Sequence, residues 1–228
     1  MKKILIAAVI ALAAVSLRAE ADGYIMLSVC SPGELPGPSS IIHGGRLSLI
    51  YGECRELYGL DIGVSGYVHE RMDGMQVGLV FNYVDSASGA QFGFANVVDH
   101  EFYGLQDGAW NHAGFVAGVQ RGVVNTAGYV DGSQFSSVIN WAGELYGYQA
   151  SAWWNHVIVG AGMQHGFVNT AGYFAGFQLG LLNWANDLDG LQIGLVNVTT
   201  HLYGCQIGLL NFATDREWTF WPFINIGW

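Results

Sequence analysis

The side chains that could do acid–base, nucleophilic or metal chemistry are scattered along this chain. The two densest polar clusters are Asp99-His100-Glu101 and Asp187-Leu188-Asp189, and both fall in short segments where aspartate favours turns. Enzymes need titratable groups that converge on one place. The histidines lie at separate points instead: His43, His69, His100, His112, His156, His165 and His201. We therefore predict a protein that is not an enzyme.

Motifs that bind metals or cofactors are also missing from the sequence. Asp187 and Asp189 offer too few of the roughly six to eight oxygen ligands that calcium takes. No serine lies in a Gly-x-Ser-x-Gly motif, and no glycine-rich loop of the phosphate-binding kind is present. We predict no catalytic residue, no cofactor and no metal site.

The first 21 residues have the layout of a cleaved secretory signal. Lys2 and Lys3 precede an apolar run from Ile4 to Leu17, and small residues surround the junction before Asp22. Cleavage at that junction would release a chain that is long enough for one sizeable domain.

The composition of the exported chain restricts its partners. It has five arginines, no lysine and seventeen acidic residues, and five minus seventeen gives a formal charge of −12. Nucleic-acid binding is excluded because phosphates are neutralised by basic side chains. In an oxidising compartment Cys30 and Cys54 could pair, which would leave Cys205 over.

A repeat of 14 or 15 residues fills most of the exported chain. Its phrase, Gly-x-Gln-x-Gly-x-x-Asn, is clearest in GLQIGLVN at 190–197 and GCQIGLLN at 204–211. Two degenerate copies have Leu47 and Asp61 in place of the glutamine. The glutamines are Gln76, Gln91, Gln106, Gln120, Gln134, Gln149, Gln164, Gln178, Gln192 and Gln206. The closing asparagines are Asn82, Asn96, Asn111, Asn125, Asn140, Asn155, Asn169, Asn183, Asn197 and Asn211.

Residue types alternate within the phrase, which is the two-residue period of a β-strand with unlike faces. One face is nearly invariant and holds glycine and glutamine; the other varies but stays apolar. Each repeat is therefore predicted to form one strand and one short turn, in which asparagine and glycine adopt the backbone angles that the turn requires. Helix is excluded because each glycine costs about 1 kcal/mol there. The glutamines are expected to face a confined interior, as a structural ladder or lining a lumen.

The exported chain is therefore predicted to be a single all-β domain in three parts. Residues 22–44 form an N-terminal strand and a proline-rich loop, residues 45–217 form the repeat, and residues 218–228 form an aromatic C-terminal strand.

An antiparallel outer-membrane β-barrel of about 14 strands is the first architecture that fits. Strands of about ten residues match a tilted membrane strand, and closed barrels are the β-structures that cross bilayers. Aromatic residues would form two interfacial girdles, which are Tyr83, Trp141, Trp184 and Phe212 on one side and Tyr103, Tyr146 and Tyr203 on the other. Against this architecture, Asp107, Arg121 and His165 would lie on the lipid face.

A β-solenoid is the alternative architecture, with each repeat forming one coil. It explains why all the repeats are equivalent, and stacked glutamine and asparagine ladders explain why those residue types recur. Its weakness is that Leu191, Ile193, Leu195 and their equivalents become a large apolar exterior in water.

The last eleven residues, WTFWPFINIGW, leave the repeat and end on Trp228. Their alternating apolar residues resemble the C-terminal strand of outer-membrane proteins, which the assembly machinery reads. Pro222 departs from that pattern. The resemblance implies that Trp228 is an assembly signal.

Two further resemblances concern the repeat. The phrase Gln-x-Gly-x-x-Asn-x-Ala at Gln120, Gln164, Gln178 and Gln206 resembles the core of the curlin repeat, which implies a secreted, self-assembling parallel β stack. Curlin repeats are longer and carry a further serine and glutamine that are missing here.

Residues 74–228 more closely resemble poorly characterised bacterial surface repeat proteins, first named in spirochaetes, which share phrases such as GLQIGLVN. That resemblance implies an exported surface protein and no activity.

These features predict a protein of the bacterial outer membrane or cell surface with a structural or passive-pore role. Its expected partners are the lipid bilayer and the outer-membrane assembly machinery. The alternative is a surface solenoid that acts through protein–protein contacts or self-assembly.

Overall fold

The computed structural model describes residues 22–228, and the predicted signal, residues 1–21, lies outside them. Strands, turns and bends make up the described residues. Among those residues there is no helix long and apolar enough to cross a membrane. The chain divides into two units, one up to Gly114 and one from Phe115 to Trp228, which are described separately.

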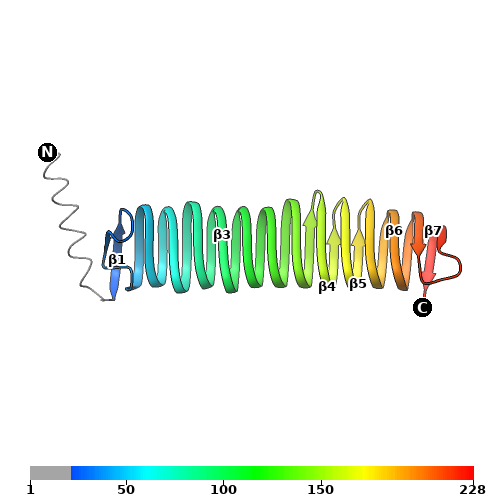
Figure 1. Ribbon diagram of the computed structural model, residues 1–228, viewed down its shortest axis with the longest axis horizontal. Helices are drawn as coiled ribbons and strands as arrows, with labels where there is room; N and C mark the ends of the chain where they lie inside the picture. The colour runs from blue at the N-terminus through cyan, green and yellow to red at the C-terminus, as the bar shows by residue number, and fades with distance from the viewer. Residues whose placement is uncertain (1–21) are drawn as a thin grey trace. The chain divides into compact units, whose positions relative to one another are not determined.

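Long strands dominate both units. The strands in chain order are β1 (Gly23–Ser28), β2 (Glu34–Leu35), β3 (Ile41–Ser151), β4 (Trp154–His165), β5 (Val168–Leu179), β6 (Leu182–Ala213) and β7 (Phe220–Gly227). β3 and β6 extend over more than one repeat, so the ribbon winds through successive coils within each unit (Figure 1).

Neighbouring repeats of the C-terminal unit pair in parallel and in register. Gln149 of β3 pairs with Gln164 of β4, which pairs with Gln178 of β5, which pairs with Gln192 of β6. Each repeat is therefore one coil laid on the coil before it, and equivalent residues stack. The chain is a β-solenoid, the alternative architecture. The expected antiparallel barrel is wrong, because strands next to each other in such a barrel run in opposite directions.

The interior of each coil is packed with side chains. The ten repeat glutamines are fully buried, and so are the ten asparagines. Apolar residues complete the core, for example Ala142, Leu145 and Val157. The expectation that the asparagines are turn residues is wrong, since all ten lie within strands, where their side chains are buried. The glutamines form part of a packed core and line no open lumen.

The glycine that precedes each glutamine by two residues is required by the close stacking of coils. Gly190 has a φ of +149°, and a Cβ there would lie 2.1 Å from the carbonyl oxygen of Gly176 one coil earlier. A side chain would meet both a strained backbone and a direct clash. Glycine at this position of the repeat is therefore required by the close approach of neighbouring backbones.

The N-terminal unit begins with a cap that departs from the repeat. β1 pairs in parallel with the start of β3, where Met26 faces Arg46, and antiparallel with the short β2. Pro32, Pro36 and Pro38 lie in the cap between β1 and β3. The three cysteines are free thiols, so Cys30 and Cys54 are not paired.

The C-terminal unit ends with a strand that reverses direction. β7 pairs antiparallel with β6, and Asn225 faces Gln206. Pro222 and Phe223 interrupt β7, and Phe223 has a φ of +68°. The tail thus forms an antiparallel cap on the last coil. Trp228, predicted as an assembly signal, is 92% exposed at its end.

Candidate functional site

Two ladders of side-chain amides cross the coils and hold the interior in register. In the C-terminal unit, Gln192 Nε2 donates to Gln178 Oε1 at 2.7 Å, and Gln206 Nε2 donates to Gln192 Oε1 at 2.8 Å. Asn183 Nδ2 donates to Asn197 Oδ1 at 2.8 Å. The glutamine ladder thus donates toward the N-terminus and the asparagine ladder toward the C-terminus. Because the side-chain dipoles of the two ladders run in opposite directions, they partly cancel.

Each ladder satisfies polar groups that would otherwise be costly to bury. A buried amide without a partner costs about 1–3 kcal/mol. Asn183 also donates to the backbone oxygen of Ile193 at 2.9 Å, so one asparagine holds both its neighbour and the strand. These residues are structural, and none of them touches solvent.

The first ladder position is an ion pair that the sequence analysis missed. Arg46 is buried, and its Nη2 lies 2.6 Å from Asp61 Oδ2. Arg46 Nη1 also approaches Cys54 Sγ at 3.1 Å and donates to the Tyr67 carbonyl at 2.8 Å. The predicted anchor, Leu47, is wrong by one residue and lies 55% exposed. The signal was available, because Gly44 precedes Arg46 by two residues, as in every other copy.

Glycine makes room for this guanidinium. Gly66 stands where later coils have asparagine, and a Cβ there would lie 2.9 Å from Arg46 Nη2 and 2.4 Å from Asp61 Oδ2. The absent amide leaves Asn82 Oδ1 without a donor at the start of the asparagine ladder. Arg46 and Asp61 therefore replace the asparagine in the first coils.

The outward side chains next to the repeat phrase are apolar. Five outward positions of each coil make up a surface that we call the apolar face. They are the residues directly before and directly after the glutamine, the two residues directly before the asparagine, and the residue directly after the asparagine. In the last three coils all fifteen such residues are apolar and none is buried. They are Phe177, Leu179, Leu181, Leu182, Trp184, Leu191, Ile193, Leu195, Val196, Val198, Cys205, Ile207, Leu209, Leu210 and Phe212.

A groove runs along this face in the C-terminal unit. Its floor is the glycine column Gly166, Gly180 and Gly194, and its rims are the flanking side chains such as Ile193 and Leu195. The groove has a volume of about 440 Å³. Glycine is held at the floor by packing, since a Cβ on Gly194 would lie 2.3 Å from the Gly180 carbonyl oxygen.

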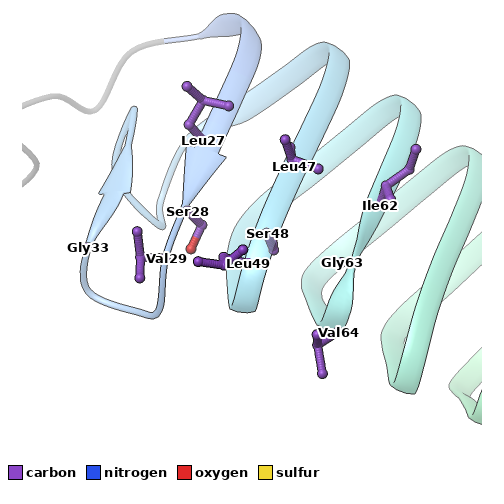
Figure 2. A pocket seen from close by; sticks show the side chains of 10 residues that line it. All are labelled: Leu27, Ser28, Val29, Gly33, Leu47, Ser48, Leu49, Ile62, Gly63 and Val64. Carbon is purple, nitrogen blue, oxygen red and sulfur yellow. The ribbon is translucent and has the colours of Figure 1, made fainter.

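The N-terminal unit carries a separate groove of the same construction. Figure 2 shows Leu27, Leu47 and Ile62 along one rim, on β1 and two coils of β3. Val29, Leu49 and Val64 line the other rim. Ser48 and Gly63 lie between the rims, and the groove has a volume of about 410 Å³.

Both caps continue the apolar columns although neither contains the repeat phrase. Leu27 of β1 pairs with Leu47 in the N-terminal unit. In the C-terminal unit, Ile224 of β7 pairs with Ile207, and Ile226 pairs with Cys205. Ile224 is 54% and Ile226 58% exposed. Terminal units of a repeat protein usually turn a polar surface outward, so this retention of apolar residues calls for a functional explanation.

The acidic residues and the histidine of the last three coils lie away from the apolar face, whereas Asp107, Arg121 and His165 occupy positions of that face in earlier coils. Several titratable groups pair between coils. His100 Nδ1 lies 2.7 Å from Asp85 Oδ1, and His201 Nδ1 lies 2.7 Å from Asp187 Oδ1. Tyr83 bonds to Asp99, and this hydrogen bond, with partial burial, raises the pKa of Tyr83. No group of three His, Cys, Asp or Glu residues that could hold a metal ion occurs within residues 22–228. The arrangement is one of isolated surface pairs.

Comparison with known proteins adds no family to this description. No known protein family matches the chain, and neither a curated protein nor a solved structure matches it.

Proposed function

We propose that this protein is an exported structural β-solenoid that acts through lateral contacts made by its apolar face. The observation that carries the proposal is the continuation of the apolar columns into both caps, at Leu27 and at Ile224. Core packing does not require those residues to be apolar, because they point away from the interior. A large exposed apolar patch marks an interaction site in a soluble protein.

The two ends of the chain support lateral contact over end-to-end growth. A strand edge grows by adding another strand, and proline or an irregular backbone blocks this addition. Pro222 lacks an N–H, and the φ of +68° at Phe223 breaks the extended conformation of β7. In the N-terminal unit, the proline-containing cap covers the start of β3. Fibre growth by stacking chains, which the curlin resemblance implies, is therefore disfavoured.

The proposed location is the bacterial outer membrane or cell surface. It is supported by the signal layout of residues 1–21 and by the resemblance of the repeat to bacterial surface proteins. The passive-pore role is withdrawn together with the barrel, because the interior is filled by buried amides.

The proposal can be tested by replacing apolar residues at the rim of the groove and measuring how the exported protein divides between the sedimenting and soluble fractions. The wild type should sediment with the envelope or as an assembly. The triple variant Ile193→Ser/Leu195→Ser/Ile207→Ser should be found in the soluble fraction instead. The control variant Thr200→Ser alters a polar position of the same coils and should sediment like the wild type. A soluble, monomeric wild-type protein would contradict the proposal.

A further inference from the structure

We infer that the partner of the apolar face in the C-terminal unit is the surface of an uncharged, zwitterionic lipid bilayer, on which the solenoid lies without crossing it. The inference rests on the proposed function and names its partner. Three observations on the last coils favour lipid over a protein surface, and a fourth indicates which lipid charge fits.

Side-chain size varies along the columns of this face while polarity does not. The position before the glutamine is Phe177, Leu191 and Cys205 in successive coils, and Ile226 follows in β7. A packed protein interface needs matched shapes on its two sides. Hydrocarbon requires only that the face be apolar, so a column that changes volume at every step fits lipid better.

Amphipathic aromatic residues stand at both borders of the face. Trp184 lies at one border, 49% exposed, and its Nε1 donates to Asn186 Oδ1 at 3.4 Å, on the polar side. Tyr203 lies at the other border, 59% exposed and one coil after Asp189. Tryptophan and tyrosine favour the level of lipid headgroups, with the ring toward the chains and the polar tip toward water. In the C-terminal unit, Trp184 and Tyr203, which were predicted to belong to two girdles, thus lie at the two margins of one face.

Charged side chains are segregated from the face in the last three coils. Asp187 and Asp189 belong to the outward columns on the other side of the coil, and His201 pairs with Asp187 there. The fifteen positions of the face carry no charge. Inserting them into the apolar boundary of a bilayer therefore requires no desolvation of an ion.

The choice of a zwitterionic bilayer follows from the basic residues. Anionic membranes attract clusters of lysine and arginine. The C-terminal unit has no lysine, and its two arginines form no cluster, because Arg121 lies in β3 and Arg216 lies between β6 and β7. Arg216 donates to the backbone oxygens of Ile226 and Leu202 at 2.9 and 3.2 Å. With acidic residues in excess, binding to anionic lipid is expected to be weaker than binding to zwitterionic lipid.

Flotation with phosphatidylcholine vesicles tests the inference on the protein purified after export. The wild type should float with the vesicles, and the triple variant Ile193→Ser/Leu195→Ser/Ile207→Ser should partition at least about tenfold less, because its apolar burial is lost. The control Thr200→Ser, at a polar position of the same coils, should float like the wild type. Far-UV circular dichroism must show that all three proteins are folded. The emission of Trp184, isolated by comparison with Trp184→Phe, should shift to the blue on binding.

The possible failures separate the two proposals. A folded wild type that does not float but forms dimers or larger assemblies, which the triple variant loses, would overturn the lipid inference and leave lateral contact standing. A folded wild type that neither floats nor associates would overturn both. Equal flotation of the triple variant would show that another surface binds lipid and would also overturn the inference.

Discussion

Gln76 Nε2 donates to Asp61 Oδ2 at 3.0 Å, and this bond gives the glutamine ladder of the N-terminal unit its direction. A carboxylate only accepts hydrogen bonds, so the first glutamine must present its nitrogen to Asp61. Its oxygen is then left for Gln91, whose Nε2 donates to Gln76 Oε1 at 3.0 Å. Arg46 donates two hydrogen bonds to the Asp61 carboxylate in the interior, at 2.9 and 2.6 Å. One buried ion pair thus orients the amides stacked upon it.

The first prediction tests that ion pair by a double-mutant cycle. Arg46→Met alone should lower the free energy of unfolding by about 3–5 kcal/mol, since it leaves a buried carboxylate without its cation. Asp61→Gln alone should be similarly costly because Arg46 loses its partner. The double variant places an amide at Asp61 and an apolar residue at Arg46, and should recover most of the loss. Urea unfolding gives the coupling, and additive single effects would contradict the predicted interaction.

The second prediction concerns the middle of the ladder in the C-terminal unit. Gln192→Leu keeps the approximate volume but leaves Gln178 Oε1 without the donor that Gln192 supplies, at about 1–3 kcal/mol. It also removes one acceptor of Gln206 Nε2, which keeps the Phe212 oxygen at 3.1 Å. The midpoint temperature of thermal unfolding should fall markedly. The matched control is Ile193→Ser, the next residue, which is exposed and should change stability by about 0.5 kcal/mol or less. If the two variants lost equal stability, the ladder would have no special role.

The third prediction compares two glycines in the N-terminal unit. Gly59→Ala should destabilise by about 2 kcal/mol or more, because φ is +143° and the new Cβ would lie 2.0 Å from the Gly44 carbonyl oxygen. Gly45→Ala is the control, since its Cβ would meet nothing nearer than the Leu60 oxygen at 3.7 Å. Chemical denaturation of both variants measures their free energies of unfolding and tests this prediction. Comparable effects would show that coil spacing does not depend on the glycine column.

The fourth prediction concerns thiol reactivity. Burial raises the pKa of Cys54 to about 12 despite the neighbouring Arg46, which lowers it. A thiol reacts as its thiolate, so at pH 8 a maleimide should label the exposed Cys30 and the part-exposed Cys205, while Cys54 stays unmodified. Reaction at Cys54 should begin on unfolding. Rapid labelling of Cys54 in the folded protein at pH 8 would contradict its burial.

The repeat, the strand period and the recurring glutamines could be predicted from residue spacing, because alternation along a strand is a local property. The anchor of the first coil was assigned one residue too late although Gly44 marks Arg46, and a strand shifted by one residue exchanges its faces. Leu47 and Arg46 are neighbours, and an isolated arginine is a poor candidate for burial. Asp61, one coil later, supplies the partner that allows Arg46 to be buried.

The asparagines were assigned to turns for a related reason. Asparagine is common in turns, and its burial becomes visible only when another asparagine lies directly beside it. Asn183 and Asn197 are fourteen residues apart, and stacking alone brings their amides to 2.8 Å. A ladder is therefore a property of two coils and cannot be detected in one.

By itself the sequence determined a chain of equivalent β repeats with glutamine and glycine on one face and apolar residues on the other. Alternation within a strand is the same in a barrel and in a solenoid, so it could not decide between them. The tertiary structure decided it by pairing each strand in parallel with the equivalent residues of the next repeat, as Gln164 pairs with Gln178. The physical reason is that identical amides bond to one another only when stacked in register, and this register leaves the apolar residues on the outside.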